Sequence, residues 1–372
     1  MGVGAASAPG PDPEGSRGPP GAAPSSASAA SGSAFAGLFR FLRTHPIVAL
    51  ALLTPGVVEY VSGSSSVLLL VEAPPAFFLF LAVNVGQYTG GALLIREAML
   101  RWGKGWVTFG CLGLAYGITE EGLGDNTLFR GTHHADGVLG VYGHFLGVNW
   151  VWSVGVLSLH VIVSLAVPIV VLGLAIPETR GRSLIGPRGQ LVCLLTVVGA
   201  TVLESYSVWR LDDFWMGPVL FGASVGTVLL LLLAARLAPA RWWAPTREEP
   251  VASPRSMFLA GFGYFSVALA LEYGLSWARL PPALEIGIEL AALAAILEWV
   301  RRSIGRRHHD HLLVRLAFGF VAWVAAFGVR LTLPFPYTLP LAAVAVYFFL
   351  RLGTRYPAPV PATHGGPGPA PA

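Results

Sequence analysis

Residues 147–176 read GVNWVWSVGVLSLHVIVSLAVPIVVLGLAI, and no Asp, Glu, Lys or Arg interrupts this stretch. An α-helix needs about 20 mainly apolar residues to cross the hydrocarbon core of a bilayer. The stretch is therefore predicted to be a membrane-spanning helix. The remaining composition agrees, because 54% of the 372 residues are hydrophobic and only 12% are charged, whereas a soluble domain has about 25% charged residues.

Apolar stretches of similar character recur on both sides of residues 147–176. We predict an all-α integral membrane protein whose transmembrane helices, about ten in number, form one bundle. Its transmembrane domain is expected over residues 35–355, between Gly-, Ala-, Ser- and Pro-rich tails at 1–34 and 356–372 that are predicted to be disordered. The expected spans cover residues 46–61, 76–98, 104–121, 147–176, 189–208, 216–238, 257–276, 281–300, 312–332 and 335–352.

The distribution of charge predicts the orientation of these spans. With the boundaries above, 20 of the 24 Lys and Arg residues fall on the side of the N-terminus, together with eight of the 20 acidic residues. That side carries +12 and the opposite side −8. Because basic residues gather on cytoplasmic connections, both termini are predicted to be cytoplasmic in a multi-pass protein of the cell membrane.

The same distribution explains the net charge of +4 without a nucleic-acid partner. The expected partner is the lipid bilayer, while the oligomeric state and any cofactor remain unknown from sequence. The two cysteines, Cys111 and Cys193, have no metal-ligand spacing around them. Motifs for nucleotide-driven pumping, for dinucleotide binding and for common metallo- and serine hydrolases are absent from the sequence.

Polar residues recur on one face of the helix predicted for residues 147–176. At 100° per residue, Asn149, Ser153, His160 and Ser164 lie along one stripe. If Asn149 marks the outer edge of the membrane, His160 lies about 16 Å deeper, near the middle of the hydrocarbon core. A polar stripe of this kind is typical of an ion or proton path, whereas a lone buried histidine is more often structural.

The preceding predicted span ends in Glu120 and Glu121. A bare carboxylate in hydrocarbon costs several kcal/mol, so these side chains must be hydrated, paired or neutralised. They are candidates for a general base or for a cation-binding pair, and an interfacial helix end in water is the alternative. The long connection that follows holds Asn126, His133, His134 and His144. The adjacent His133 and His134 lack a third ligand at a standard spacing, so no metal site is predicted.

Further carboxylates lie on the predicted outer half of the chain. Glu285 and Glu289 stand four residues apart, so they share one face of the span at 281–300. This pair suits a proton or cation relay, or alternatively a structural partnership with Arg330 or Arg279. Glu204 ends the span at 189–208 on the same side.

Four segments resemble a group of functionally uncharacterised polytopic membrane proteins of bacteria and archaea. They are GGALLIREAML (90–100), LAYGITEEGL (114–123), VYGHFLGVNWVW (141–152) and VVEYVSGSS (57–65), which matches the end of the first span. His160 belongs to the same resemblance. This resemblance covers roughly residues 55–180 and implies the order of elements, without an activity.

A looser similarity is to intramembrane proteases of the CAAX-processing type, which place a Glu-Glu pair and later histidines on separate spans. Their pattern has an Arg after the Glu pair and a His four residues before Asn or Asp. Here GLGDN follows Glu121, and His144 precedes Asn149 by five residues. The similarity implies a carboxylate that activates water and a histidine, His144 or His160, that stabilises the oxyanion.

We therefore expect an outward-facing acidic and histidine-containing polar cavity. The first interpretation is a transporter or binding protein for a cation or small polar solute, the second an intramembrane hydrolase, and the third a non-catalytic scaffold. Catalytic residues, if the protein is an enzyme, would be Glu120, Glu121, His144 and His160. The expected solute- or ion-binding residues are Asn126, Asn149, Ser153, Glu204, Glu285 and Glu289.

Overall fold

The computed structural model describes residues 37, 40–130 and 141–357. The chain divides into two units, Met1–Thr44 and His45–Ala372. In the first unit the described residues, 37 and 40–44, are helical. The structure is 76% helical, as predicted for an all-α protein. The predicted tail at 1–34, residues 358–372 of the other tail, and His133 and His134 lie outside the described residues.

The first half of the second unit contains helices whose conformation changes along their length. Four of these helices each contain one short π-helical segment, labelled η, that continues directly from an α-helical stretch. In chain order the elements are α2 (Pro46–Pro55), η1 (Gly56–Val61), α3 (Leu69–Glu72), α4 (Pro74–Asn84), η2 (Val85–Thr89), α5 (Gly90–Trp102), α6 (Trp106–Gly117) and η3 (Ile118–Gly124).

A short hairpin, β1 (His144–Phe145) with β2 (Val148–Asn149), leads into the long apolar helix that the sequence predicts. This helix consists of α8 (Trp150–Leu159), η4 (His160–Ala166) and α9 (Val167–Ala175), followed by the 3-10 turn η5 (Pro177–Thr179). Long regular helices then complete the unit: α10 (Pro187–Asp212), α11 (Gly217–Leu237), α12 (Pro254–Trp277), α13 (Pro282–Ser303), α14 (Asp310–Leu331) and α15 (Leu339–Gly353).

Each predicted span contains a helix, but not every helix has the length and apolar composition of a membrane span. Six do, and they support a membrane protein: Pro74–Trp102, Trp150–Ala175, Pro187–Asp212, Gly217–Leu237, Pro254–Trp277 and Asp310–Leu331. The predicted number of about ten is not confirmed. The helices Pro46–Val61 and Leu339–Gly353 are shorter, and the glutamates of η3 and of α13 make those helices more polar.

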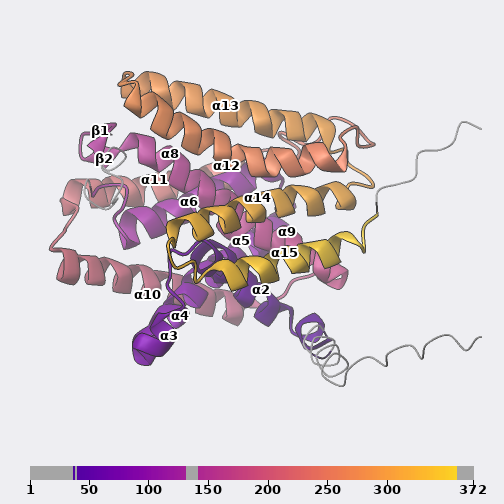
Figure 1. Cartoon of the computed structure of the whole chain (residues 1–372), viewed down its shortest axis with the longest axis horizontal. Helices are drawn as coiled ribbons and strands as arrows, with labels where there is room; N and C mark the ends of the chain where they lie inside the picture. Colours follow the sequence, from indigo (N-terminus) through magenta and orange to yellow (C-terminus); the bar gives the residue numbers. More distant parts are fainter. Residues whose placement is uncertain (1–36, 38–39, 131–140, 358–372) are drawn as a thin grey trace, which may run out of the picture. The chain divides into compact units, whose positions relative to one another are not determined.

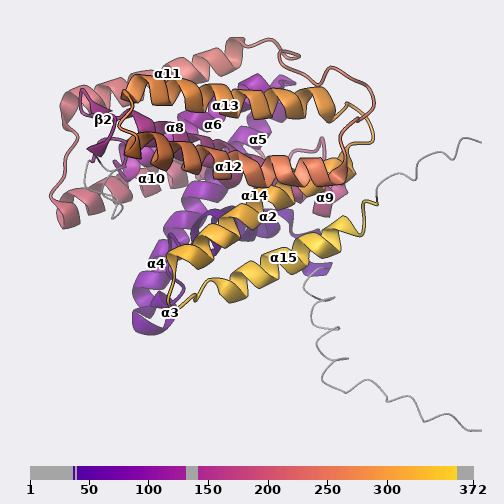
Figure 2. The ribbon, with the colours of Figure 1, turned by 45° about the horizontal axis from the view of Figure 1, so that its top comes forward.

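The most extensive helix contact joins α12 to α14. Gly261 and Gly319 face each other, and a Cβ atom on Gly261 would overlap the carbonyl oxygen of Leu316. A Cβ atom on Gly319 would overlap the carbonyl oxygen of Phe258 in the same way. Figure 2 shows α12 between α13 and α14. Small residues let helix backbones approach closely in lipid, where van der Waals packing drives association.

Glycines also bring the helices of the N-terminal half together. A Cβ atom on Gly90 would lie 3.0 Å from Val197 of α10. On the other side of the bundle, Gly113 and Gly117 receive side chains of the α8–η4 helix. These contacts set the distance between α6–η3 and α8–η4, the two helices that carry the site described below.

We expect Gly261→Val to lower the free energy of unfolding by roughly 1–3 kcal/mol or more, because the added methyl groups would force α12 away from α14. The matched control is Gly263→Val on the same helix, where an added Cβ would meet no atom within 4 Å. Thermal unfolding of the purified protein in detergent measures both. Equal losses in the two variants would contradict the close-contact explanation.

Candidate functional site

Ionisable side chains from four separate helices meet inside the second unit. Each of these helices is π-helical where it contributes: Glu59 lies in η1, Tyr88 in η2, Glu120 and Glu121 in η3, and His160 in η4. π-Helical turns in α-helices occur frequently at functional sites, because the extra residue redirects side chains and disturbs the regular hydrogen bonding. Among the described residues these are the four π-helical segments, and all of them reach the same cluster.

The centre of the cluster is the imidazole of His160, which has a carboxylate at each ring nitrogen. Nε2 lies 2.7 Å from Glu121 Oε1, and Nδ1 lies 2.8 Å from Glu120 Oε2. Nδ1 also lies 3.1 Å from the hydroxyl of Ser164. The Glu120 contact is close in distance but not aligned as a hydrogen bond. His160, Glu120 and Glu121 are only 2%, 4% and 7% exposed, so the three groups must satisfy one another.

Tyr88 connects this centre to a further carboxylate. Its hydroxyl lies 2.5 Å from Glu120 Oε1 and 2.6 Å from Glu59 Oε1. A phenol carries one hydrogen and can donate to one oxygen at a time. The hydroxyl therefore bridges the two carboxyl groups. Ser65 donates to the second oxygen of Glu59 over 2.7 Å, and the ring of Tyr88 is stacked parallel to that of His160.

The chain after η3 folds back to hold the other carboxylate. Thr127 donates a hydrogen bond to Glu121 Oε2, and the indole of Trp152 donates to the Thr127 hydroxyl over 3.3 Å. Leu128 and Phe129 pack into a buried cluster with Val156 of α8. The residues directly after the Glu pair therefore complete the site.

Further carboxyl groups surround the site. Asp125 follows η3, and burial together with the charges of Glu121 and Glu120 raises the pKa of Asp125 to about 8. Glu204 of α10 lies close to Gly124, where an added Cβ atom would contact its carboxylate. A site surrounded by so many carboxyl groups attracts cations and disfavours anions.

The geometry of the central three residues suits a metal ion. One ligand atom from each of Glu120, Glu121 and His160 can be chosen so that all lie within 4.8 Å of one another. Two carboxylates and one imidazole form a donor set for divalent first-row transition metals. Tyr88, Thr127 and Ser164 orient the three donors by hydrogen bonds, as residues around metal ligands commonly do.

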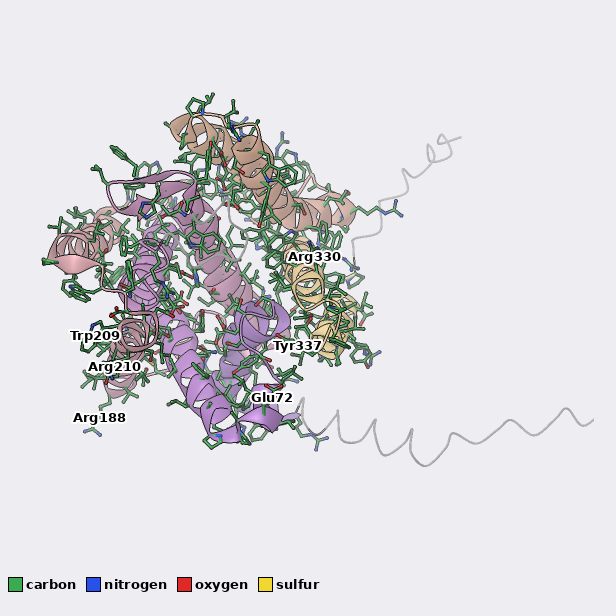
Figure 3. The ribbon with its side chains drawn as sticks, turned by 60° about the vertical axis from the view of Figure 1, so that its left-hand side comes forward. Glu72, Arg188, Trp209, Arg210, Arg330 and Tyr337 are labelled. Carbon is green, nitrogen blue, oxygen red and sulfur yellow. The ribbon has the colours of Figure 1, made fainter. Side chains whose placement is uncertain are left out.

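A cavity of about 360 Å³ lies beside the Glu pair. Thr119 and Leu123, which flank the two glutamates in η3, line it together with residues of α10 and α11. Most of its lining is apolar and aromatic, including Trp209, which Figure 3 shows at the edge of the bundle. Glu120, Glu121 and His160 themselves do not line this cavity.

The predicted polar stripe of α8–η4 is buried as expected, but its members have different contacts. Ser164 joins His160. Asn149 instead caps α8 by accepting a hydrogen bond from the Trp152 backbone, and Ser153 donates to the Asn149 carbonyl over 2.6 Å. Asn126 is buried too, and its amide donates to the carbonyl of Gly124 over 2.6 Å. These three predicted ligand-binding residues therefore form local backbone contacts next to the site.

The remaining predicted residues lie apart from His160. His144 is exposed on β1, where its Nε2 lies 3.1 Å from the carbonyl oxygen of Phe129. The structure thus places His144 on the hairpin against the segment that follows the Glu pair, without a contact to His160 among the described residues. Glu285 and Glu289 are fully buried on α13, which packs against α12 and α8 and not against η3. They belong to a second location.

Tyr88, Thr127 and Glu59 were not among the predicted site residues. Tyr88 stands in the sequence as an aromatic residue near the middle of an apolar span, where packing is the ordinary explanation. A signal was available in retrospect: GVVEYV and VGQYT combine small and polar residues inside otherwise apolar spans. Such interruptions can mark irregular helical turns.

We expect Tyr88→Phe to lower the free energy of unfolding by about 1–3 kcal/mol, because Glu59 and Glu120 would lose the donor between them. Tyr206→Phe is the matched control, since Tyr206 is 54% exposed on α10 and its change should stay within about 0.5 kcal/mol. Thermal unfolding in detergent gives both values. A Tyr88 variant as stable as the Tyr206 variant would show that the hydroxyl contributes nothing.

Comparisons with known proteins assign no function to this site. No family model matches the chain, and no similar curated protein or solved structure was found.

Proposed function

We propose that the chain is a multi-pass protein of the cell membrane that binds a divalent transition-metal cation at Glu120, Glu121 and His160 and moves that cation. The observation that carries this proposal is the convergence of one ligand atom from each of these buried side chains within 4.8 Å. In this proposal the spans number about ten and both termini are cytoplasmic. The charge asymmetry of the sequence supports that orientation.

The donor set determines the class of cation. Imidazole and carboxylate together favour metals such as Zn²⁺, Mn²⁺ or Fe²⁺ over alkali cations. Three protein ligands leave at least one coordination position for water or another ligand, as in catalytic and exchangeable sites rather than closed structural ones. The metal would also relieve the repulsion between Glu120 and Glu121, which otherwise lie side by side with a single imidazole between them.

The acidic outer half of the protein indicates the side from which a cation would approach the site. On the predicted topology the outer side carries −8 and the inner side +12, as derived above from the sequence. A negative surface concentrates dications near the outer end of the bundle. Glu59, Asp125 and Glu204 place further carboxyl oxygens around the centre, which could coordinate a cation as it releases their protons.

We expect purified wild-type protein to bind about one Zn²⁺ or Co²⁺ per chain. Glu121→Gln and His160→Ala should each weaken that affinity at least about tenfold, since each removes one of three ligands. His144→Ala is the control, because it removes a histidine that is exposed and hydrogen-bonded elsewhere. Metal content after dialysis and the visible absorption of bound Co²⁺ measure the effect. Equal binding by all four proteins would refute the site.

A second candidate function, intramembrane hydrolysis, is favoured by the 2.7 Å contact between Glu121 and His160. A carboxylate and an imidazole at this distance can activate a water molecule and support the developing negative charge. The cavity beside Thr119 and Leu123 would admit an apolar substrate from the membrane. A bound metal is compatible with this alternative, because a metal ion can also activate water.

Reconstitution into liposomes separates the two functions. A carrier should accumulate radioactive Zn²⁺ in the vesicles, whereas a hydrolase should cleave members of a quenched fluorescent peptide library without accumulation. Glu121→Gln should reduce whichever activity is present at least a hundredfold, and His144→Ala should leave it within twofold. If neither uptake nor cleavage depends on Glu121, the centre is structural, and the protein is the non-catalytic scaffold considered as the third interpretation.

A further inference from the structure

A cavity of about 290 Å³ lies where α5 ends and α6 begins, on the side of the bundle predicted to be cytoplasmic. Most of its wall is apolar and consists of Met99, Trp106, Phe109, Ala166, Ile169 and Val170. The charged residues of the wall are Arg96 and Lys104. The cavity therefore combines a hydrocarbon-like surface with positive charge, and it is separate from Glu120, Glu121 and His160, which do not line it.

Three helices that carry the His160 centre enclose this cavity. Its residues at 96–99 belong to α5, those at 106–109 to α6, and those at 166–170 to η4–α9. The helix α5 packs against α6 and α9, and Figure 1 shows α5 and α9 beside each other near the middle of the view. Each of the three helices continues from, or into, a π-helical segment of the site. A molecule bound in the cavity would therefore contact all three helices at once.

The turn between α5 and α6 brings Lys104 to the cavity. Gly103 ends α5 in the left-handed conformation with a φ of 59°, and the backbone N–H of Lys104 donates to the Met99 carbonyl over 3.2 Å. The side-chain ammonium donates to the carbonyl of Ala238. An ammonium carries three hydrogens, so two remain for a ligand. In the part of the chain that the structure describes, Lys104 has no carboxylate partner, and its positive charge is not neutralised.

The start of α6 beside Lys104 also favours an anion. This helix begins at Trp106, and no side chain caps its first turn. The first N–H groups of a helix lack partners within the helix, and the helix dipole is positive there. Arg96, in contrast, is held by protein groups, because its guanidinium pairs with Glu97 over 3.0 Å and donates to the carbonyl of Arg182 over 2.8 Å. Lys104 is thus the charged residue of this cavity that is available to a ligand.

We propose that this cavity binds an anionic phospholipid, whose phosphate lies at Lys104 and whose acyl chain lies along the apolar wall. A soluble anion would leave the apolar residues without a partner, and a hydrocarbon chain alone would not use the unneutralised ammonium. Trp106 lines the cavity and is 44% exposed, as is typical of an aromatic ring at the level of the headgroups. Basic pockets between membrane helices on the cytoplasmic side bind lipid headgroups in this manner.

Native mass spectrometry of the full-length protein in detergent measures this binding, by titration with phosphatidylglycerol or with zwitterionic phosphatidylcholine. We expect the first phosphatidylglycerol to bind at least about fivefold more tightly than the first phosphatidylcholine, because one charge near a membrane surface contributes about a factor of five. Glycerol 3-phosphate carries the charge without the acyl chains. It should not displace phosphatidylglycerol at an equal concentration.

Two variants separate the charge from the apolar wall. Lys104→Gln should weaken phosphatidylglycerol binding about fivefold and leave phosphatidylcholine binding within about twofold. Val170→Phe should weaken the binding of both lipids, because the larger ring fills the cavity. The matched controls are Arg101→Gln, at an exposed position near the same end of α5, and Val192→Phe, at a position 59% exposed on α10. Neither residue lines the cavity, so both variants should bind like the wild-type protein.

Equal affinity of the wild-type protein for the two lipids would overturn the proposal, and so would displacement of the lipid by glycerol 3-phosphate. Equal losses in Lys104→Gln and Arg101→Gln would show a diffuse attraction to basic residues instead of a site. Unchanged binding by a folded Val170→Phe would place the lipid elsewhere, and if that variant does not fold, Lys104→Gln still decides. His160→Ala should bind phosphatidylglycerol like the wild-type protein, because this cavity is independent of the proposed cation site.

Discussion

The contact of His160 with a carboxylate at each ring nitrogen constrains the surrounding helices more than any other interaction. In a protein interior an unpartnered charged or polar group costs several kcal/mol. Glu120, Glu121 and His160 are buried together, so each depends on the position of the other two. The helices α6–η3 and α8–η4 must therefore keep one register and one distance, which the glycines of α6 permit. Tyr88, Thr127 and Ser164 then take the remaining hydrogen-bonding positions around the three groups.

The four π-helical segments show how apolar helices present polar groups to one another. A regular α-helix places its side chains at fixed angles of 100°, and two adjacent glutamates would then diverge. In η3 the extra residue in the turn lets Glu120 and Glu121 reach opposite nitrogens of one imidazole. The irregular turns at Glu59, Tyr88 and His160 lie at the same cluster. Packing alone does not explain why all four irregular segments lie at one cluster, because an irregular backbone is unfavourable unless its polar groups are satisfied.

The α8–η4 helix separates two groups of buried carboxylates. Gly155 and His160 are five residues apart, so they point in directions about 140° apart around the helix. One face meets two carboxylates with an imidazole, and the other meets Glu272 of α12, whose carboxylate lies against Gly155. The helix is otherwise composed of apolar residues that pack against its neighbours.

The sequence by itself determined the helical class, the approximate position of each helix and the buried stripe through His160. It did so because hydropathy and helical periodicity are local properties, as residues 147–176 show. It could not decide which polar groups meet. His160 and Glu121 are 39 positions apart, Tyr88 belongs to another helix, and His144 lies on a hairpin against Phe129. Such pairings depend on helix register and on irregular turns, which arise when many long-range contacts form together, so only the tertiary structure decided them.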